Sequence, residues 1–441
     1  MGDLVCSAQF NYLIDLPWLL QQYPPEKRKC PLLVVHGDQK DANIRKAAAP
    51  YPNVTLFKAR LEIMFGTHHS KMMLLAYREG LRVVIHTANL IPKDWDQKTQ
   101  GVWVSPLFPA KSSVTPSKSE TVVNGGKETG FKQDLLEYLK AYGGRGLEEW
   151  KQRISDHDLS AARVRLIASV PGAHTGGEMN KWGHLKLRKV LSTCSSLPCG
   201  ATPSDWPVIG QFSSVGSLGP APSQWLTSEW LTSLSSSSSS SASSSKKPRT
   251  LTTQHKMPPL KLIFPSVENV RTSLEGYMAG GSIPYAANTA AKQPYLRDFL
   301  HQWRAEETGR TRAAPHVKTY MRVSPDQREA AWILITSCNL SKAAWGALEK
   351  KGSQLKIRSY EIGVLFLPSD QETSAGHTSF SVATMHPHGP GAGSSSVPGM
   401  GMRLVTPFDL PLTPYTREDQ PWVWNARHMK PDSKGNVWTP P

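Results

Sequence analysis

The chain of 441 residues has few cysteines and no long apolar segment. Its five cysteines are irregularly spaced and match neither a disulfide framework nor a zinc-binding pattern. We therefore expect a reducing compartment, the nucleus or the cytosol. No segment approaches the ~20 consecutive apolar residues of a membrane-spanning helix. The first residues also lack the basic and apolar regions that would predict a secretory signal.

Acidic residues are scarce relative to basic ones. The 35 aspartates and glutamates face 51 lysines and arginines, which gives a formal net charge of +16. This excess indicates a polyanionic partner, for which nucleic acid is the leading interpretation and an anionic membrane surface the rival. The sequence offers no carboxylate cluster suited to a metal ion, so we predict that the protein uses no metal and no other cofactor.

The pattern of apolar residues predicts an α/β fold. Strand-like apolar runs occur at residues 32–35, 54–57, 63–65, 72–75, 81–85 and 164–167. Helical spacing of apolar residues occurs over residues 131–142, which end at Gly143-Gly144, and again from Tyr295 to Trp303. Such alternation is typical of a sheet with helices on both faces.

The run at residues 164–167 indicates the start of a second half, so we predict two domains, 1–157 and 158–441. A serine-rich segment near 233–250 and a Gly, Ser, His and Pro-rich segment near 369–399 predict disordered insertions. The first insertion ends in Lys246-Lys247-Pro248-Arg249, which is either a nuclear-import signal or the charged end of a linker.

One short constellation of residues occurs twice, about 250 residues apart. Each copy has a histidine, a lysine two residues later, an apolar strand, an asparagine, and a tryptophan six residues after the asparagine. On a strand, a histidine and a lysine with this spacing point to the same face. The two copies are His69, Lys71, Asn89 and Trp95, and His316, Lys318, Asn339 and Trp345.

Coincidence is the alternative explanation for a single His-x-Lys triplet, because the chain has 14 histidines and 51 lysines and arginines. The extension to asparagine and tryptophan, in the same order and twice, favours function. Two such sets, related by a pseudo-twofold axis, would place two imidazoles, two ammonium groups and two carboxamides around one small anion. The pattern therefore predicts a phosphodiester site.

The doubled motif resembles that of the phospholipase D superfamily, and several flanking strings resemble its tyrosyl-DNA phosphodiesterase branch, which releases stalled topoisomerase I from DNA 3′ ends. These strings include AQFNY, GTHHSKMMLL, GLRVVIHTANLI, DWDQKTQG, GQFSSVGSLG, SVENVRTSLEGY, NLSKAAWGALEK, SYEIGVLFLP and PWVWN. The resemblance implies two similar phospholipase D-like α-β-α sandwich halves related by a pseudo-twofold axis, with the active site at their interface. The broader superfamily has an aspartate five residues after each lysine, where this chain has Ala76 and Val323.

The resemblance assigns His69 as the nucleophile and His316 as the general acid, which then becomes the base that activates water. His68 falls outside the His-x-Lys register, so we interpret it as structural. The resemblance also assigns two residues, Gln100 and Glu361, to orient the imidazoles, and which histidine each serves stays open. The phosphate oxygens would be held by Lys71, Lys318, Asn89 and Asn339.

Further residues are candidates for DNA or peptide contacts. The Ser/Gly loop with Ser213, Ser214 and Ser217 offers hydroxyls and backbone N–H groups to phosphates, although a plain turn is the simpler reading without the resemblance. We expect Ser341 and Lys342, directly after Asn339, to contact the strand next to the scissile bond. Phe65 is a candidate for base stacking, with core packing as the alternative. The groove-lining positions of the family match Tyr12, Pro284 and Trp424.

The resemblance thus implies a monomeric, metal-independent DNA-repair phosphodiesterase. It would remove 3′-phosphotyrosyl and related adducts from single- or double-stranded DNA through a covalent phosphohistidine and leave a 3′-phosphate. We expect it in the nucleus, alone or with the cytoplasm, and without a membrane partner. One alternative is another phospholipase D-superfamily nuclease or phospholipase, against which Ala76 and Val323 argue. A catalytically dead DNA-binding scaffold is the other, and the two intact motifs argue against it.

Overall fold

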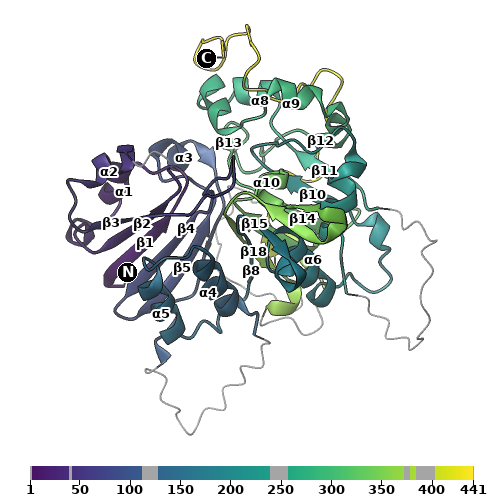
Figure 1. Ribbon diagram of the computed structural model, residues 1–441. Coiled ribbons are helices and arrows are strands. Elements are labelled where there is room, and N and C mark those ends of the chain that lie inside the picture. Colours follow the sequence, from purple (N-terminus) through teal and green to yellow (C-terminus); the bar gives the residue numbers. More distant parts are fainter. Residues whose placement is uncertain are drawn as a thin grey trace, which may run out of the picture. The chain divides into compact units, whose positions relative to one another are not determined.

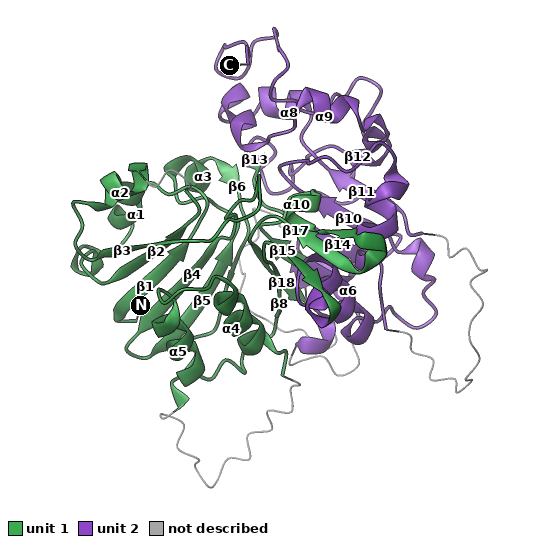
Figure 2. Ribbon diagram, in the orientation of Figure 1, with its two compact units in different colours: residues 1–176, 315–318, 334–366 green, residues 177–314, 319–333, 367–441 purple. Residues whose placement is uncertain are grey.

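A computed structural model describes residues 2–38, 42–111, 128–238, 257–371, 378–383 and 403–440 (Figure 1). The chain forms two compact units, which are coloured separately in Figure 2. Unit 1 comprises residues 1–176, 315–318 and 334–366, and unit 2 comprises residues 177–314, 319–333 and 367–441. Both units contain helices and strands, as the predicted α/β class requires.

The main sheet of unit 1 has six strands in the order β3-β2-β1-β4-β5-β7. Strands β1, β2 and β3 are parallel to one another, and β1, β4, β5 and β7 follow with antiparallel pairing. Every residue of β2 is buried, as expected for a parallel strand covered on both faces. The strands are β1 (Leu4–Phe10), β2 (Leu32–His36), β3 (Val54–Lys58), β4 (Met72–Tyr77), β5 (Gly80–His86) and β7 (Val102–Val104).

The helices of unit 1 present apolar residues to its core. Helix α1 begins after Asp15, whose side chain accepts a hydrogen bond from the Trp18 N–H, and its leucines pack with Leu32 and Val34 of β2. Helix α4 buries one face and ends before Gly143, which adopts φ +65°. The helices are α1 (Leu16–Gln21), α2 (Ala42–Ala48), α3 (Pro92–Asp96), α4 (Phe131–Ala141), α5 (Glu148–Asp156) and α10 (Lys342–Trp345).

Two further sets of strands complete unit 1. Strands β8 and β18 are antiparallel, and β17 lies between β16 and β9 with antiparallel pairing on both sides. Their bounds are β6 (Lys98–Thr99), β8 (Arg165–Ser169), β9 (Gly172–Thr175), β16 (Ala347–Glu349), β17 (Gln354–Ile357) and β18 (Glu361–Phe366). Strand β15 (Glu329–Thr336) is divided between the units after residue 333.

Unit 2 contains the strand series β12-β11-β10-β14, with β10 parallel to β11 and antiparallel to β14. Its strands are β10 (Val208–Gln211), β11 (Leu260–Ile263), β12 (Leu300–His301), β14 (Thr319–Val323), β19 (Phe380–Ala383) and β20 (Arg403–Val405). Its helices are α6 (Gly183–Cys194), α7 (Thr232–Leu234), α8 (Val267–Arg271) and α9 (Ala287–Ala291). Among the described residues, no helix has both the length and the apolar character needed to cross a bilayer.

Several predicted elements differ from the structure. The strands predicted at 32–35, 54–57, 72–75, 81–85 and 164–167 are confirmed, but the one at 63–65 is wrong. Phe65 lies in a turn with φ +62°, a conformation that a strand does not allow. The predicted helix from Tyr295 to Trp303 is a 3-10 helix, Pro294–Phe299, followed directly by strand β12.

The predicted insertions fall mostly outside the described residues, which omit 239–250, 372–377 and 384–399, so their disorder stays a prediction. The described residues at their edges include regular structure. Helix α7 lies at the edge of the first insertion, and strand β19 inside the second pairs with β20. The boundary between residues 157 and 158, which rests on the strand predicted at 164–167, stays a prediction. The compact units divide the chain differently, since residues 315–318 and 334–366 belong to the same unit as the first motif.

Candidate active site

The first His-x-Lys triplet lies in a short loop directly before strand β4, not within a strand as predicted. Its alternation nevertheless follows a strand. His68 and Ser70 point to helix α4, where His68 Nε2 accepts a hydrogen bond from the Tyr142 hydroxyl at 2.9 Å and Ser70 bonds the Tyr138 hydroxyl. These two contacts fix one side of the loop against helix α4. His69 and Lys71 alternate with His68 and Ser70 and therefore point to the opposite side of the loop.

His68 is structural, as the sequence predicted. Its Nδ1–H donates to the Asn11 carbonyl at 3.1 Å, and burial lowers the pKa of its imidazole to about 3. A neutral imidazole with both nitrogens bonded has no lone pair left for chemistry. It serves as a fixed link between strand β1 and helix α4.

The second triplet also directly precedes a strand, β14. The His316 and Val317 N–H groups both donate to the Thr99 carbonyl at 2.9 Å, and in the first motif the His69 N–H donates to the Tyr360 carbonyl at the same distance. The close approach depends on Gly101, because a Cβ there would lie 3.0 Å from the Val317 side chain. Thr99 and Tyr360 each directly precede a predicted orienting residue, Gln100 and Glu361.

The structure therefore resolves which orienting residue each histidine contacts. His69 Nδ1–H donates to Glu361 Oε2 at 2.8 Å, and that carboxylate also accepts from the Ser337 hydroxyl. His316 Nδ1–H faces Gln100 Oε1 at 3.3 Å. The residue that orients each histidine thus follows the other motif in the chain, and Nε2 of neither imidazole has a hydrogen bond to any residue that the structure describes.

The two lysines repeat one contact. Lys71 Nζ donates to the carbonyl of His69 at 3.1 Å, and Lys318 Nζ donates to the carbonyl of His316. Neither lysine is exposed. Burial lowers the pKa of Lys71 to about 8 and holds the pKa of Lys318 well below its ordinary value. Two buried ammonium groups in one place favour an anion between them.

Burial favours the neutral form of both histidines. Burial lowers the pKa of His69, although the Glu361 carboxylate partly opposes that effect. Burial, reinforced by the charges of Lys318 and Lys71, holds the pKa of His316 well below its ordinary value. Neutral His69 with its proton on Nδ1 presents the Nε2 lone pair that a nucleophile needs.

The asparagines that close the motifs lie in unit 1 with the histidines and lysines. Asn89 is buried, and its carboxamide oxygen makes no hydrogen bond to any residue that the structure describes. Its carbonyl accepts from Trp95 Nε1 at 2.9 Å, which accounts for the spacing of these two residues in the first motif. Asn339 is half-buried and precedes helix α10, while Trp345 is fully buried.

Asp94 is a site residue that the sequence reasoning missed. Its side chain is fully buried, and its Oδ2 accepts from the Asn89 N–H at 2.7 Å and lies 3.4 Å from His316 Nδ1. Its Oδ1 lies 3.6 Å from Lys98 Nζ. The string DWDQKTQG begins at Asp94, so the signal was present, but no second copy of the aspartate marked it.

Four predicted contact residues belong to unit 1. Tyr12 is half exposed, and its ring packs edge-on against the imidazole of His69 with centroids 5.6 Å apart. Phe65 is 77% exposed, which rules out the core-packing alternative. Ser341 caps helix α10 by accepting from the Ala344 N–H at 3.1 Å, and Lys342 is half-buried beside it.

The remaining predicted contact residues belong to unit 2. Ser214 Oγ donates to the Pro284 carbonyl at 2.9 Å, and the Trp424 N–H donates to the neighbouring Tyr285 carbonyl at 3.1 Å. The structure thus brings Ser214, Pro284 and Trp424 together within this unit. Of the other loop serines, Ser217 is exposed and Ser213 is buried.

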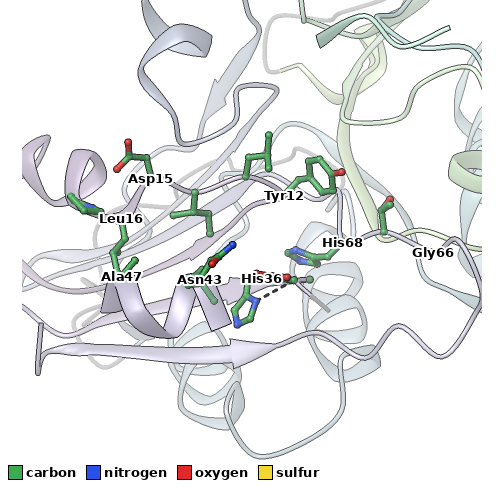
Figure 3. Close-up of a pocket in the computed structure, with 15 residues that line it drawn as sticks. Tyr12, Asp15, Leu16, His36, Asn43, Ala47, Gly66 and His68 are labelled. Atoms are coloured by element: carbon green, nitrogen blue, oxygen red, sulfur yellow. Dashed lines mark hydrogen bonds between the residues drawn. The ribbon is translucent and has the colours of Figure 1, made fainter. Parts of the chain in front are cut away.

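A cavity of about 730 Å³ opens beside the first triplet (Figure 3). Its lining combines the ends of strands β1 and β2 with helices α1 and α2, and includes Tyr12, His36, Asn43, Gly66 and His68. The carboxyl ends of parallel strands are a common place for ligand sites. Tyr12 lines this cavity, and its ring also packs against the imidazole of His69.

The described residues contain no group of three or more His, Cys, Asp or Glu side chains arranged to hold a metal ion. The buried charges of the site come instead from Lys71, Lys318 and Lys98 and from the carboxylates of Glu361 and Asp94.

This arrangement agrees with the comparison to known proteins. Residues 2–416 match the tyrosyl-DNA phosphodiesterase family. The chain belongs to that family. It is 39% identical to tyrosyl-DNA phosphodiesterase 1 of Arabidopsis thaliana, over 99% of this chain and 72% of that protein. It is 37% identical to tyrosyl-DNA phosphodiesterase 1 of Drosophila melanogaster, over 96% of this chain and 68% of that protein.

The chain also shares its fold with a solved structure. The crystal structure of yeast tyrosyl-DNA phosphodiesterase superimposes with a TM-score of 0.66 at 21% identity, covering 96% of this chain and 94% of that one. The α/β fold expected from the family resemblance is therefore confirmed.

Proposed function

We propose that this protein hydrolyses the phosphodiester between a tyrosine and a DNA 3′ end and leaves a 3′-phosphate. One observation carries the proposal: each histidine is oriented through Nδ1 by a residue that follows the other motif. Within the part of the chain that the structure describes, both Nε2 atoms have no hydrogen bond, and two buried lysines lie beside them. Membership of the tyrosyl-DNA phosphodiesterase family supports the choice of substrate.

The first step joins protein and DNA. Nε2 of His69 attacks phosphorus, the bond from phosphorus to the tyrosyl oxygen breaks, and the proton on His316 Nε2 passes to that oxygen. Lys71 and Lys318, with Asn89 and Asn339, stabilise the charge on the non-bridging oxygens. The negative phosphodiester also offsets the two ammonium groups, which raises the pKa of His316 from its value in the free protein.

The second step releases the DNA. His316, now neutral, takes a proton from water as the water attacks phosphorus, and the bond from phosphorus to His69 breaks. This returns His69 to its neutral form and produces the 3′-phosphate. Glu361 stabilises the positive charge that His69 carries while it is bonded to phosphorus, because its carboxylate accepts from Nδ1.

A 3′-phosphotyrosyl oligonucleotide, incubated with the protein in excess chelator, tests this function. Conversion to a 3′-phosphate is expected. Substrate that is bound but left intact would indicate a scaffold, and cleavage only after a metal is restored would contradict metal independence. The same assay with phosphatidylcholine vesicles should give no product.

The proposal extends to the DNA surface. Exposed Phe65, held at positive φ, supports base stacking, because a bulky residue rarely adopts that conformation without a functional reason. We propose that single- and double-stranded 3′ ends both bind, to a monomer acting in the nucleus. Contacts to DNA and peptide are assigned to Ser213, Ser214, Ser217, Ser341, Lys342, Tyr12, Pro284 and Trp424.

Salt should weaken DNA binding steeply, because bound counterions are released when lysines and arginines contact phosphates. Lys342→Ala should reduce the slope of log affinity against log salt for single-stranded DNA by about 0.7, the value for one lost phosphate contact. Fluorescence anisotropy at several salt concentrations measures the slope. Lys140→Ala, at an exposed position of helix α4, serves as the control and should keep the parent slope. An affinity that does not change with salt would contradict the proposal that lysines and arginines contact the DNA phosphates.

Binding of the product should depend on pH through Lys71. Its pKa of about 8 means that the ammonium form is lost as the pH rises from 7 to 9, so the affinity for a 3′-phosphate oligonucleotide should fall over that range. One coupled proton gives at most about a tenfold decrease per pH unit.

The control ligand for this measurement is the same oligonucleotide with a 3′-hydroxyl, which should bind with little change over this pH range. Lys71→Gln should weaken 3′-phosphate binding at pH 7 and flatten its pH dependence. A parent affinity that stays constant from pH 7 to pH 9 would mean that Lys71 does not hold the phosphate.

A further inference from the structure

The two motifs differ in one buried charge. Six residues after the asparagine, both carry a tryptophan, but five residues after it the first motif has Asp94 and the second has Ala344. Both side chains are buried. The first motif therefore brings a carboxylate into unit 1 that the second does not match, and this carboxylate lies 3.4 Å from Nδ1 of His316.

Hydrogen bonds to neighbouring residues hold Asp94 in place. It lies in helix α3, its Oδ2 accepts from the Asn89 N–H at 2.7 Å, and its own carbonyl accepts from Gln100 Nε2 at 3.0 Å. Its Oδ1 is buried and makes no hydrogen bond within the described parts of the chain, although Lys98 Nζ lies 3.6 Å away. Leaving a buried carboxylate oxygen without a hydrogen bond is costly, so a functional reason is expected.

The contacts of the two histidines are also unequal. His69 meets a carboxylate at 2.8 Å, whereas His316 meets the Gln100 amide oxygen at 3.3 Å and Asp94 at 3.4 Å. An amide oxygen orients an imidazole but does little to favour its charged form. In the first step His316 must carry two protons, with Lys318, Lys71, Lys98 and His69 nearby. Asp94 is the negative group that faces it.

We propose that Asp94 is a positioning residue for His316: it holds the imidazole and supplies the negative charge that lets it act as an acid. The proposal rests on the function proposed above. With the phosphodiester bound, three ammonium groups (Lys71, Lys98, Lys318) face two carboxylates (Glu361, Asp94), and the substrate's single negative charge balances the difference. Removing Asp94 would leave an excess of positive charge that disfavours protonated His316.

Asp94→Asn tests this role, because asparagine keeps the shape and the acceptor for the Asn89 N–H but loses the charge. Single-turnover formation of the protein–DNA adduct from a 3′-phosphotyrosyl oligonucleotide should slow by about 10- to 100-fold at neutral pH, part of the usual contribution of a general acid. With a 3′-(4-nitrophenyl) phosphate, whose leaving group needs no proton, the rate should stay near that of the parent protein. Asp96→Asn, on the same helix but exposed, should behave as the parent does with both substrates.

The pH profile provides a second readout. The first step needs protonated His316, so its rate falls as the pH rises through the pKa of His316 in the substrate complex. Without the Asp94 charge, the falling limb should move to lower pH. Lys98→Gln should move it to higher pH, because that change removes a positive charge that opposes protonation of His316. The second variant carries the test if Asp94→Asn melts below the assay temperature.

The outcomes separate this inference from the proposed function. If the parent protein fails to cleave the tyrosyl substrate, the proposed function is wrong. If the parent cleaves it and Asp94→Asn is slowed equally with both leaving groups, or not slowed at all, the role of Asp94 is overturned. A falling limb that stays in place in Lys98→Gln would also count against it.

Discussion

His69→Ala will abolish turnover and leave no protein joined to DNA, with a loss of at least about a thousandfold in rate. The reason is geometric. Among the described residues, nothing bonds Nε2 of His69, while a carboxylate holds its Nδ1 at 2.8 Å. The neighbouring His68 has both nitrogens bonded and a pKa lowered to about 3, so it cannot replace it. A denaturing gel of the reaction, with labelled DNA, measures both product and adduct.

Free imidazole provides the control for this variant. The side chain of His69 is 14% exposed, so its truncation opens a space near the surface rather than a core cavity. Added imidazole should restore part of the cleavage, because it supplies the missing nucleophile, and the restored reaction should give no protein adduct. Substantial activity of His69→Ala without imidazole would point instead to direct attack by water.

Much of the site could be predicted because its chemistry is repeated. Two copies of the same pattern made coincidence a poor explanation. The structure places His69, Lys71, His316 and Lys318 in one compact unit, and both lysines are buried. Alternation along the first triplet was predicted for the wrong reason. The residues form a loop before β4, and contacts of His68 and Ser70 with helix α4 produce the alternation.

Other features depend on tertiary packing, and the sequence could not supply them. Gln100 and Glu361 each orient the histidine of the other motif, a pairing fixed by the backbone contacts of Thr99 and Tyr360 and by the absence of a side chain at Gly101. Asp94 lacked a second copy, so the repeated pattern did not mark it. The apolar run at 63–65 resembled a strand because its residues favour strands, yet it forms an exposed turn.

His316→Ala should accumulate DNA that is covalently joined to the protein through His69. A tyrosyl leaving group has a pKa of about 10, so it departs at a reduced rate even without a proton donor. Water is a poor nucleophile until a base removes its proton, so the second step depends more strongly on His316. The variant should therefore slow adduct hydrolysis more than adduct formation, by roughly tenfold or more.

The adduct should migrate as a shifted band under denaturing conditions and should break down in acid, as expected of a phosphoramidate. Combining His316→Ala with His69→Ala should remove the band, which identifies the attachment site. Asp94→Asn should not accumulate the adduct, because loss of the negative charge slows the first step, in which His316 acts as an acid. Substrate left intact without an adduct, or turnover at the parent rate, would show that His316 is not first the acid and then the base.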